Sequence, residues 1–165
     1  MKRRPVSPLF AAQEPPTYVV DSSAWFNIRH LQNPEHAWTI MLALIELQRL
    51  VDPGQVIDEI KLDDDVWSRL HPVEARFRIN RADEVFLLLA GRIASEHPRL
   101  AGIRSKKTKA DPFVIALAEL EHFTVVADES LKRPSIKIPG VCRERKLACV
   151  SLAQLLEAED ALLTT

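Results

Sequence analysis

The sequence predicts an α/β fold, a three-layer α/β/α sandwich with a central, mostly parallel sheet. Short runs of apolar β-branched residues, of which Val19-Val20 and Val125-Val126 are the clearest, are typical of buried strands. Segments with apolar residues at helical spacing separate these runs, and strands that alternate with helices form a parallel sheet covered on both faces. The 165 residues, 47% of them apolar and 27% charged, suffice for one domain with a substantial core.

A basic, proline-rich tail over residues 1–16 precedes a single domain over residues 17–165. In the first half of the domain, the predicted elements are a strand at 18–20, a helix at 24–30 capped by Ser22 or Ser23, and a helix opened by Asn33-Pro34 whose apolar face extends to Leu50, where a second strand is faintly indicated at 50–51. A helix capped by Asp52 and carrying 56–60 follows, then a helix after 63–65 that ends at 71–72. In the second half they are a helix at 82–96, a helix from 110, a strand at 123–127, a helix at 139–146, a strand at 148–150 and a helix capped by Ser151.

Composition excludes several classes of protein. The 22 basic and 23 acidic residues give a net charge of −1, so overall charge demands neither nucleic acid nor a membrane as partner. The four glycines are too far apart for a dinucleotide-binding or phosphate-binding glycine motif. No apolar stretch reaches the roughly 18 residues of a membrane span, and we expect no membrane contact. Two cysteines that match no zinc or disulfide pattern fit a reduced, cytoplasmic protein.

Acidic residues follow two of the predicted strands. Asp21 ends the first strand, Asp128 ends the strand at 123–127, and Asp111 begins the helix that leads into that second strand. Each acid alone has a structural interpretation, as a helix cap or a turn residue. Because ligands of open parallel sheets bind at the carboxyl ends of the strands, the three together favour a site at that edge.

The pair Asp58-Glu59 supplies a fourth acid. Consecutive helical residues are rotated by about 100°, and Val56, Ile57 and Ile60 define the buried side of their helix. Glu59 lies at the flank of this side, whereas Asp58 points nearly opposite, towards solvent. Glu59 is therefore the residue predicted to reach the site.

Converging carboxylates repel one another unless a cation neutralises them. A hard divalent ion with oxygen ligands meets this need, which predicts Mg²⁺, with Mn²⁺ as a substitute. Such ions activate water and bind phosphoryl oxygens. A loop without acidic residues lies just before Asp111 and has the charge needed to hold a phosphodiester backbone. The candidate RNA-binding residues of this loop are Arg104, Lys106, Lys107 and Lys109.

Four segments of the chain resemble the PIN-domain family, a fold of metal-dependent nucleases. They are Tyr18-Val-Val-Asp-Ser-Ser, Val56-Ile-Asp-Glu59, Ala110-Asp-Pro-Phe-Val-Ile-Ala-Leu-Ala118 and Thr124-Val-Val-Ala-Asp128. The C-terminal segments 137–142 and 148–152 are similar to the end of a bacterial PIN-like toxin subfamily of VapC-like ribonucleases. The resemblance covers residue 17 to the C-terminus.

The resemblance implies an endoribonuclease whose catalytic, metal-binding acids are Asp21, Glu59, Asp111 and Asp128. It further implies that Ser22 or Ser23 supports the site by hydrogen bonding, that a cognate antitoxin holds the protein inactive, and that the protein forms a homodimer. Here Ala127 precedes Asp128 where the family has Thr or Ser, and Glu129 follows it. Asp128 and Glu129 therefore both remain candidates for the fourth ligand.

Two other functions are weighed against the ribonuclease. One is a catalytically degenerate PIN-like module that binds RNA or protein without cleaving it. The other is an aspartyl phosphatase, which needs a second aspartate two residues after Asp21 as acid and base. Ser23 occupies that position, so the sequence argues against a phosphatase.

Overall fold

The computed structural model describes residues 14–100, 109–128 and 137–163. The candidate residues Arg104, Lys106, Lys107 and Glu129 lie outside these ranges, as do residues 1–13 of the predicted tail.

The strands are β1 (Tyr18–Val20), β2 (Leu50–Pro53), β3 (Arg78–Ile79), β4 (Thr124–Val126) and β5 (Cys149–Val150). The α-helices are α1 (Ser22–Asn27), α2 (Pro34–Glu46), α3 (Gly54–Ile60), α4 (Asp64–Leu70), α5 (Glu74–Phe77), α6 (Glu84–Glu96), α7 (Asp111–Glu121), α8 (Ile138–Glu144) and α9 (Leu152–Leu163), with 3₁₀ turns at Ile28–His30 and His71–Val73.

The described strands form one parallel sheet in the order β3-β2-β1-β4-β5. Strand β1 is central: Tyr18 pairs with Leu50 on one side and with Thr124 on the other. Its residues are fully buried, with Val19 and Val20 at 0% exposure, which is why its sequence is continuously apolar rather than alternating. The predicted α/β class and parallel sheet are confirmed.

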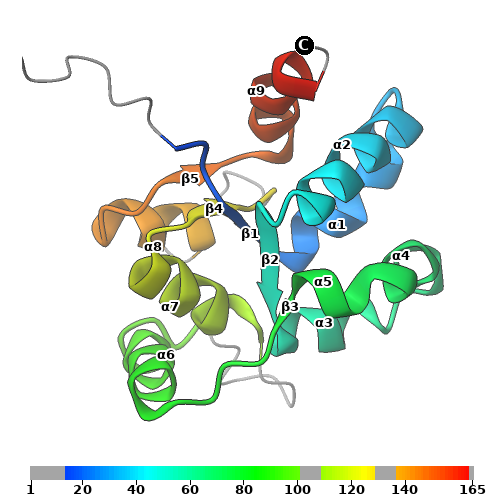
Figure 1. The fold of residues 1–165 in the computed structure, drawn as a ribbon. Helices are drawn as coiled ribbons and strands as arrows, with labels where there is room; N and C mark the ends of the chain where they lie inside the picture. Colours follow the sequence, from blue (N-terminus) through cyan, green and yellow to red (C-terminus); the bar gives the residue numbers. More distant parts are fainter. Residues whose placement is uncertain (1–13, 101–108, 129–136, 164–165) are drawn as a thin grey trace, which may run out of the picture.

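Helices cover both faces of the sheet and make it the middle of three layers (Figure 1). Helix α7 packs on β1, β2 and β4, with α6 behind it and α8 beside it. Helices α1 and α2 lie on the other side, and α2 contacts β2 and α9. The facing side chains are aliphatic: Val114, Ile115 and Leu117 on α7, and Leu44 and Ile45 on α2, are all buried. The apolar side chains on these two faces form the core. Their packing fixes the positions of the helices, including the first residues of the helices near the acids.

The segment between α2 and α3 differs from its predicted form. Helix α2 ends at Glu46, and Gln48 takes a left-handed φ of 57° that turns the chain, so that Leu50 begins a strand instead of extending the helix. Asp52 lies inside β2 and does not cap α3, whose N-cap position is held by Pro53. The short edge strand β3 also escaped prediction, because two half-buried residues carry no recognisable pattern.

A buried ion pair closes the sheet at its amino-terminal end. The Tyr18 hydroxyl donates to Glu159 Oε1 over 2.6 Å, and Arg49 donates to both Glu159 oxygens over 2.8 and 2.6 Å. Burial alone would raise the pKa of Glu159, but the hydrogen bonds from Arg49 and Tyr18 hold it below its usual value. The ionised Glu159 thereby attaches α9 to the central strand, at the end opposite to Asp21.

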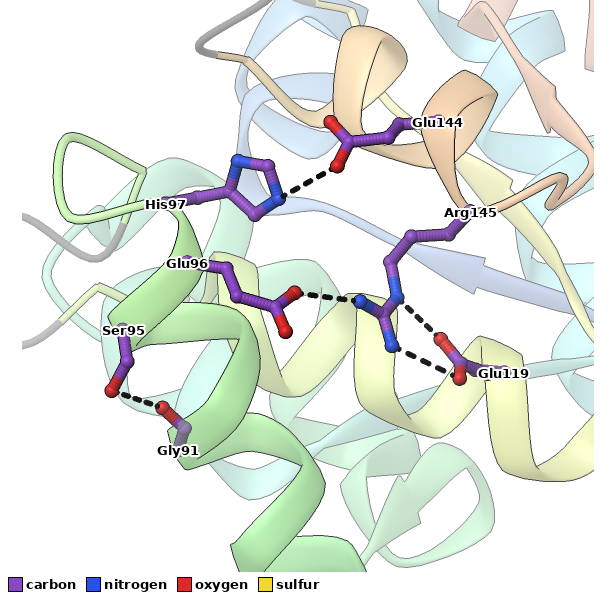
Figure 2. Close-up of polar contacts among 7 residues, drawn as sticks. All are labelled: Gly91, Ser95, Glu96, His97, Glu119, Glu144 and Arg145. Atoms are coloured by element: carbon purple, nitrogen blue, oxygen red, sulfur yellow. Dashed lines mark hydrogen bonds and ion pairs between the residues drawn. The ribbon is translucent and has the colours of Figure 1, made fainter.

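Arg145 fixes α8 to the helices beside it. Its guanidinium donates to both carboxylate oxygens of Glu119 on α7, over 2.5 and 3.1 Å, and to Glu96 on α6 over 3.1 Å (Figure 2). Nearby, Nε2 of His97 lies 3.9 Å from Glu144 Oε1, which is an ion-pair distance but too long for a hydrogen bond. The position of α8 relative to α6 and α7 therefore rests on a charged network as well as on apolar packing.

Candidate active site

The order of the strands reverses between β1 and β4. The chain passes from β1 to β2 and β3 on one side of the sheet, then crosses to β4 and β5 on the other. At such a reversal the connections leave the strand ends in opposite directions, and the crevice that opens there is where α/β proteins bind ligands. Asp21 directly follows β1, and Asp128 lies two residues after β4. Both acids thus belong to the reversal point.

Asp21 caps helix α1. Its backbone is extended, with φ −70° and ψ 150°, and its Oδ2 accepts from the backbone N–H of Ser23 over 3.1 Å. The hydroxyl of Ser23 donates to the same oxygen over 2.5 Å. The predicted cap at Ser22 or Ser23 is therefore wrong: the acid caps, and both serines lie inside the first turn. Asp21 is only 2% exposed, so its carboxylate is held rigidly at the bottom of the site.

Ser23 also joins the ends of the two strands. Its Oγ accepts a hydrogen bond from the backbone N–H of Asp128 over 3.2 Å while it donates to Asp21. One turn further along α1, Asn27 Nδ2 donates to the backbone oxygen of Asp128 over 3.1 Å and to its Oδ2 over 3.0 Å. Sequence reasoning missed Asn27. Its spacing of four residues from Ser23, on the same helical face, is the signal that could have revealed it.

Glu59 joins three helices. Its Oε2 accepts from the hydroxyl of Ser22 over 2.5 Å, and its Oε1 accepts from the backbone N–H of Ala110 over 2.9 Å. One carboxylate therefore touches the neighbour of Asp21 in sequence and the neighbour of Asp111. Glu59 is half-buried and Asp58 is exposed, as the helical rotation predicted.

Asp111 is the first residue of α7 and is followed by Pro112, which suits the first turn of a helix. It is 8% exposed, and Ala110 occupies the N-cap position that the sequence had offered to Asp111. The basic residue nearest to Asp111 in the sequence is Lys109, which is exposed and directly precedes the N-cap residue of α7. Glu59 thus contacts the residue after Asp21 and the residue before Asp111, and Ser23 contacts both Asp21 and Asp128.

Asp52 is a further acid beneath the site. It is completely buried in β2, where its Oδ1 accepts from the N–H of Val20 and its Oδ2 from Nε1 of Trp25, each over 2.7 Å. Burial raises the pKa of Asp52 well above its usual value, the two hydrogen bonds oppose this rise, and the charge of Asp21 adds to it. Asp52 therefore holds the strand end and the helix on either side of Asp21. Leu50-Val51-Asp52, a third apolar run that ends in an acid, is the signal for it.

The donor set suits a hard cation in its chemistry. All the side chains at the site offer oxygen, and Mg²⁺ is commonly held by one or two carboxylates together with water and substrate phosphate. Within the described ranges, no three His, Cys, Asp or Glu side chains are grouped closely enough to hold a metal ion by themselves. Both oxygens of Glu59 accept hydrogen bonds, and the buried carboxylates of Asp21 and Asp111 are further oxygen donors that this edge of the sheet could offer to such an ion.

The fold and site define an α/β protein in which the acidic residues Asp21 and Asp128 follow two adjacent strands of a parallel sheet. The chain belongs to the family described as a domain of unknown function (DUF4411), whose match covers residues 18–163. No curated protein matches the chain. None of the helices in the described ranges combines the length and apolar character that crossing a bilayer requires.

Proposed function

We propose that the protein is a Mg²⁺-dependent endoribonuclease of the PIN type. The observation that supports the proposal is the Glu59 carboxylate, which accepts a hydrogen bond from Ser22, next to Asp21, and another from the N–H of Ala110, next to Asp111. That edge is the reversal point of the strand order, where an α/β protein offers its crevice. The PIN-like sequence segments carry these same acids.

Each residue then has a distinct task in the reaction. Asp21 and Asp111 would hold the divalent ion, while Ser23 fixes the rotamer of Asp21 and Asn27 fixes the backbone of Asp128. Exposed Lys109 binds a phosphodiester oxygen at the start of α7. When bound, Mg²⁺ or Mn²⁺ lowers the pKa of water and stabilises the charge that develops on the phosphoryl oxygens.

By the same resemblance, the protein is the cytoplasmic toxin of a type II toxin–antitoxin pair, its natural partner is a cognate antitoxin, and it forms a homodimer. These proposals rest on the PIN-like segments of the sequence. A toxin of this kind arrests growth only while its site is intact, which connects the cellular proposal to the variants discussed below.

A second candidate function is a PIN-like module that binds RNA or protein without cleaving it. The hydrogen bonds to both oxygens of Glu59 favour it, as does the lack of a three-acid group within the described residues. In this case Glu59 is a structural link between helices, and a divalent ion has no effect on function.

Removing divalent cations separates these candidates. In EDTA we expect cleavage of a pooled single-stranded RNA to fall by about 10²-fold or more, because the charge on the phosphoryl group is no longer stabilised. Mg²⁺ or Mn²⁺ should restore it. The products are expected to carry 5′-phosphate and 3′-hydroxyl ends, because water attacks phosphorus while the bond to the 3′-oxygen breaks and that oxygen leaves as the hydroxyl. Gel analysis of end-labelled RNA with mass spectrometry measures both features.

The control for this assay is Asp58→Asn, which changes an exposed acid on the same helix as Glu59 and should cleave like the wild type. Cleavage that persists in EDTA and yields 2′,3′-cyclic phosphates would contradict the proposal. RNA binding without cleavage in any divalent ion would favour the binding module.

A further inference from the structure

A cavity of about 600 Å³ opens beside the acids, between β4, β5, α8 and the start of α9. Asp128 lines it, so the cavity borders the candidate active site at this residue. Its volume lies within the roughly 300–1,000 Å³ of small-molecule sites. A ligand that fills the cavity therefore lies next to Asp128, at the acidic edge of the sheet.

The described lining of the cavity divides into an apolar part and a polar rim. Ala127, Pro139, Leu147 and Val150 supply the apolar part, an aliphatic surface against which the face of a base can pack by van der Waals contact. The rim carries the amide of Gln154, whose Oε1 accepts from the N–H of Ser151 over 2.9 Å. The Gln154 NH₂ group makes no hydrogen bond within the described residues and can donate to the edge of a base.

Arg143 supplies the positive charge of the rim. It is exposed on α8 and makes no ion pair or hydrogen bond with a described residue. Arg145, two residues further on, is fully engaged with Glu119 and Glu96 (Figure 2). Arg143, which has no partner among the described residues, is available to bind a ligand phosphate, whereas Arg145 holds α8 in place.

We propose that this cavity binds one nucleotide of the RNA substrate next to the cleaved phosphodiester, with the base against the apolar lining and Arg143 on its phosphate. The inference rests on the proposed ribonuclease function and adds to it a subsite that selects the flanking nucleotide. The charge of Arg143 and the amide of Gln154 favour a nucleotide over an aliphatic ligand, and hydrogen bonds from Gln154 discriminate between bases.

The test is RNA binding in EDTA, where neither a metal ion nor cleavage is involved. We expect a mixed-sequence RNA hexamer to shift the amide resonances of residues 147–154 and the Gln154 side chain in two-dimensional NMR spectra. Arg143→Glu should weaken hexamer binding about tenfold, because it replaces attraction for phosphate by repulsion. The matched control is Arg92→Glu on α6, an exposed residue with the same charge change that does not line the cavity.

In Mg²⁺, Arg143→Glu should raise the KM for RNA by about the same tenfold factor and leave kcat within about threefold, because a flanking nucleotide contributes to binding more than to chemistry. Spectra in which the hexamer leaves residues 147–154 unshifted would overturn the subsite, as would equal binding by Arg143→Glu and Arg92→Glu. If RNA cleavage is absent while the hexamer still shifts these residues and needs Arg143, the ribonuclease proposal fails and the nucleotide site stands.

Discussion

Asp111→Asn and Asp21→Asn are each expected to reduce metal-dependent RNA cleavage by about 10²-fold or more. An amide keeps the size and one oxygen of the carboxylate but loses the negative charge that a hard divalent ion requires. Both side chains are almost completely buried, so an acid on the surface of the protein cannot take their place. Initial rates with end-labelled RNA in saturating Mg²⁺ measure the loss.

These two substitutions should leave the fold intact. Asparagine is as good an N-cap as aspartate, so Asp21→Asn keeps the hydrogen bond from the N–H of Ser23. Circular dichroism and the thermal midpoint are therefore expected to match those of the control Asp58→Asn. In a bacterial host, expression of the wild type should arrest growth and expression of Asp111→Asn should not. Full cleavage activity in both variants would refute the assignment of the site.

Asp52→Asn is expected to lower the free energy of unfolding by about 2–4 kcal/mol, which makes it the most destabilising conservative substitution near the site. The two oxygens of Asp52 each accept a hydrogen bond, from Val20 and from Trp25. Asparagine has only one oxygen, so its NH₂ group must face one of these donors. Urea denaturation followed by tryptophan fluorescence measures the difference, again with Asp58→Asn as the exposed control.

The free energy of unfolding that Asp52→Asn loses should also depend on pH. Burial raises the pKa of Asp52, so the folded state binds its proton more tightly than the unfolded state does. Stability from this group is fully present below the unfolded pKa of about 4 and is lost as the pH rises through the folded pKa. The difference between wild type and Asp52→Asn should therefore shrink as the pH rises above about 4. A difference that is constant from pH 4 to 8, or that grows, would contradict this behaviour of Asp52.

Much of the fold follows from local patterns in the sequence. The buried strands β1 and β4 are continuous β-branched runs, and Asn33-Pro34 opens α2 as expected. The choice of Glu59 over Asp58 needed only the rotation of a helix whose buried side was already known. Such inferences succeed because the residues that decide them are close together in the chain.

Asp52 shows why local patterns can mislead. The segment Asp52-Pro-Gly-Gln has the sequence pattern of a helix cap, and the four residues of β2 are too few to give a strand pattern stronger than this one. Only the neighbouring strand and Trp25, far away in sequence, reveal that Asp52 is a buried acceptor. Asn27 escaped for the same reason, because its partner Asp128 is distant in the chain. Contacts of this kind depend on the strand order, which the sequence alone did not specify.

Crystals of the full chain grown or soaked in Mn²⁺ test the central claim most directly, because anomalous scattering locates manganese without reference to activity. The expected result is a manganese peak bound by carboxylate oxygens of Asp21 and Asp111, at about the 2.0–2.2 Å typical of small divalent cations. The peak should disappear in Asp111→Asn crystals and persist in Asp58→Asn crystals. A peak bound elsewhere, or none at millimolar Mn²⁺, would contradict a metal-dependent site at the reversal point of the sheet.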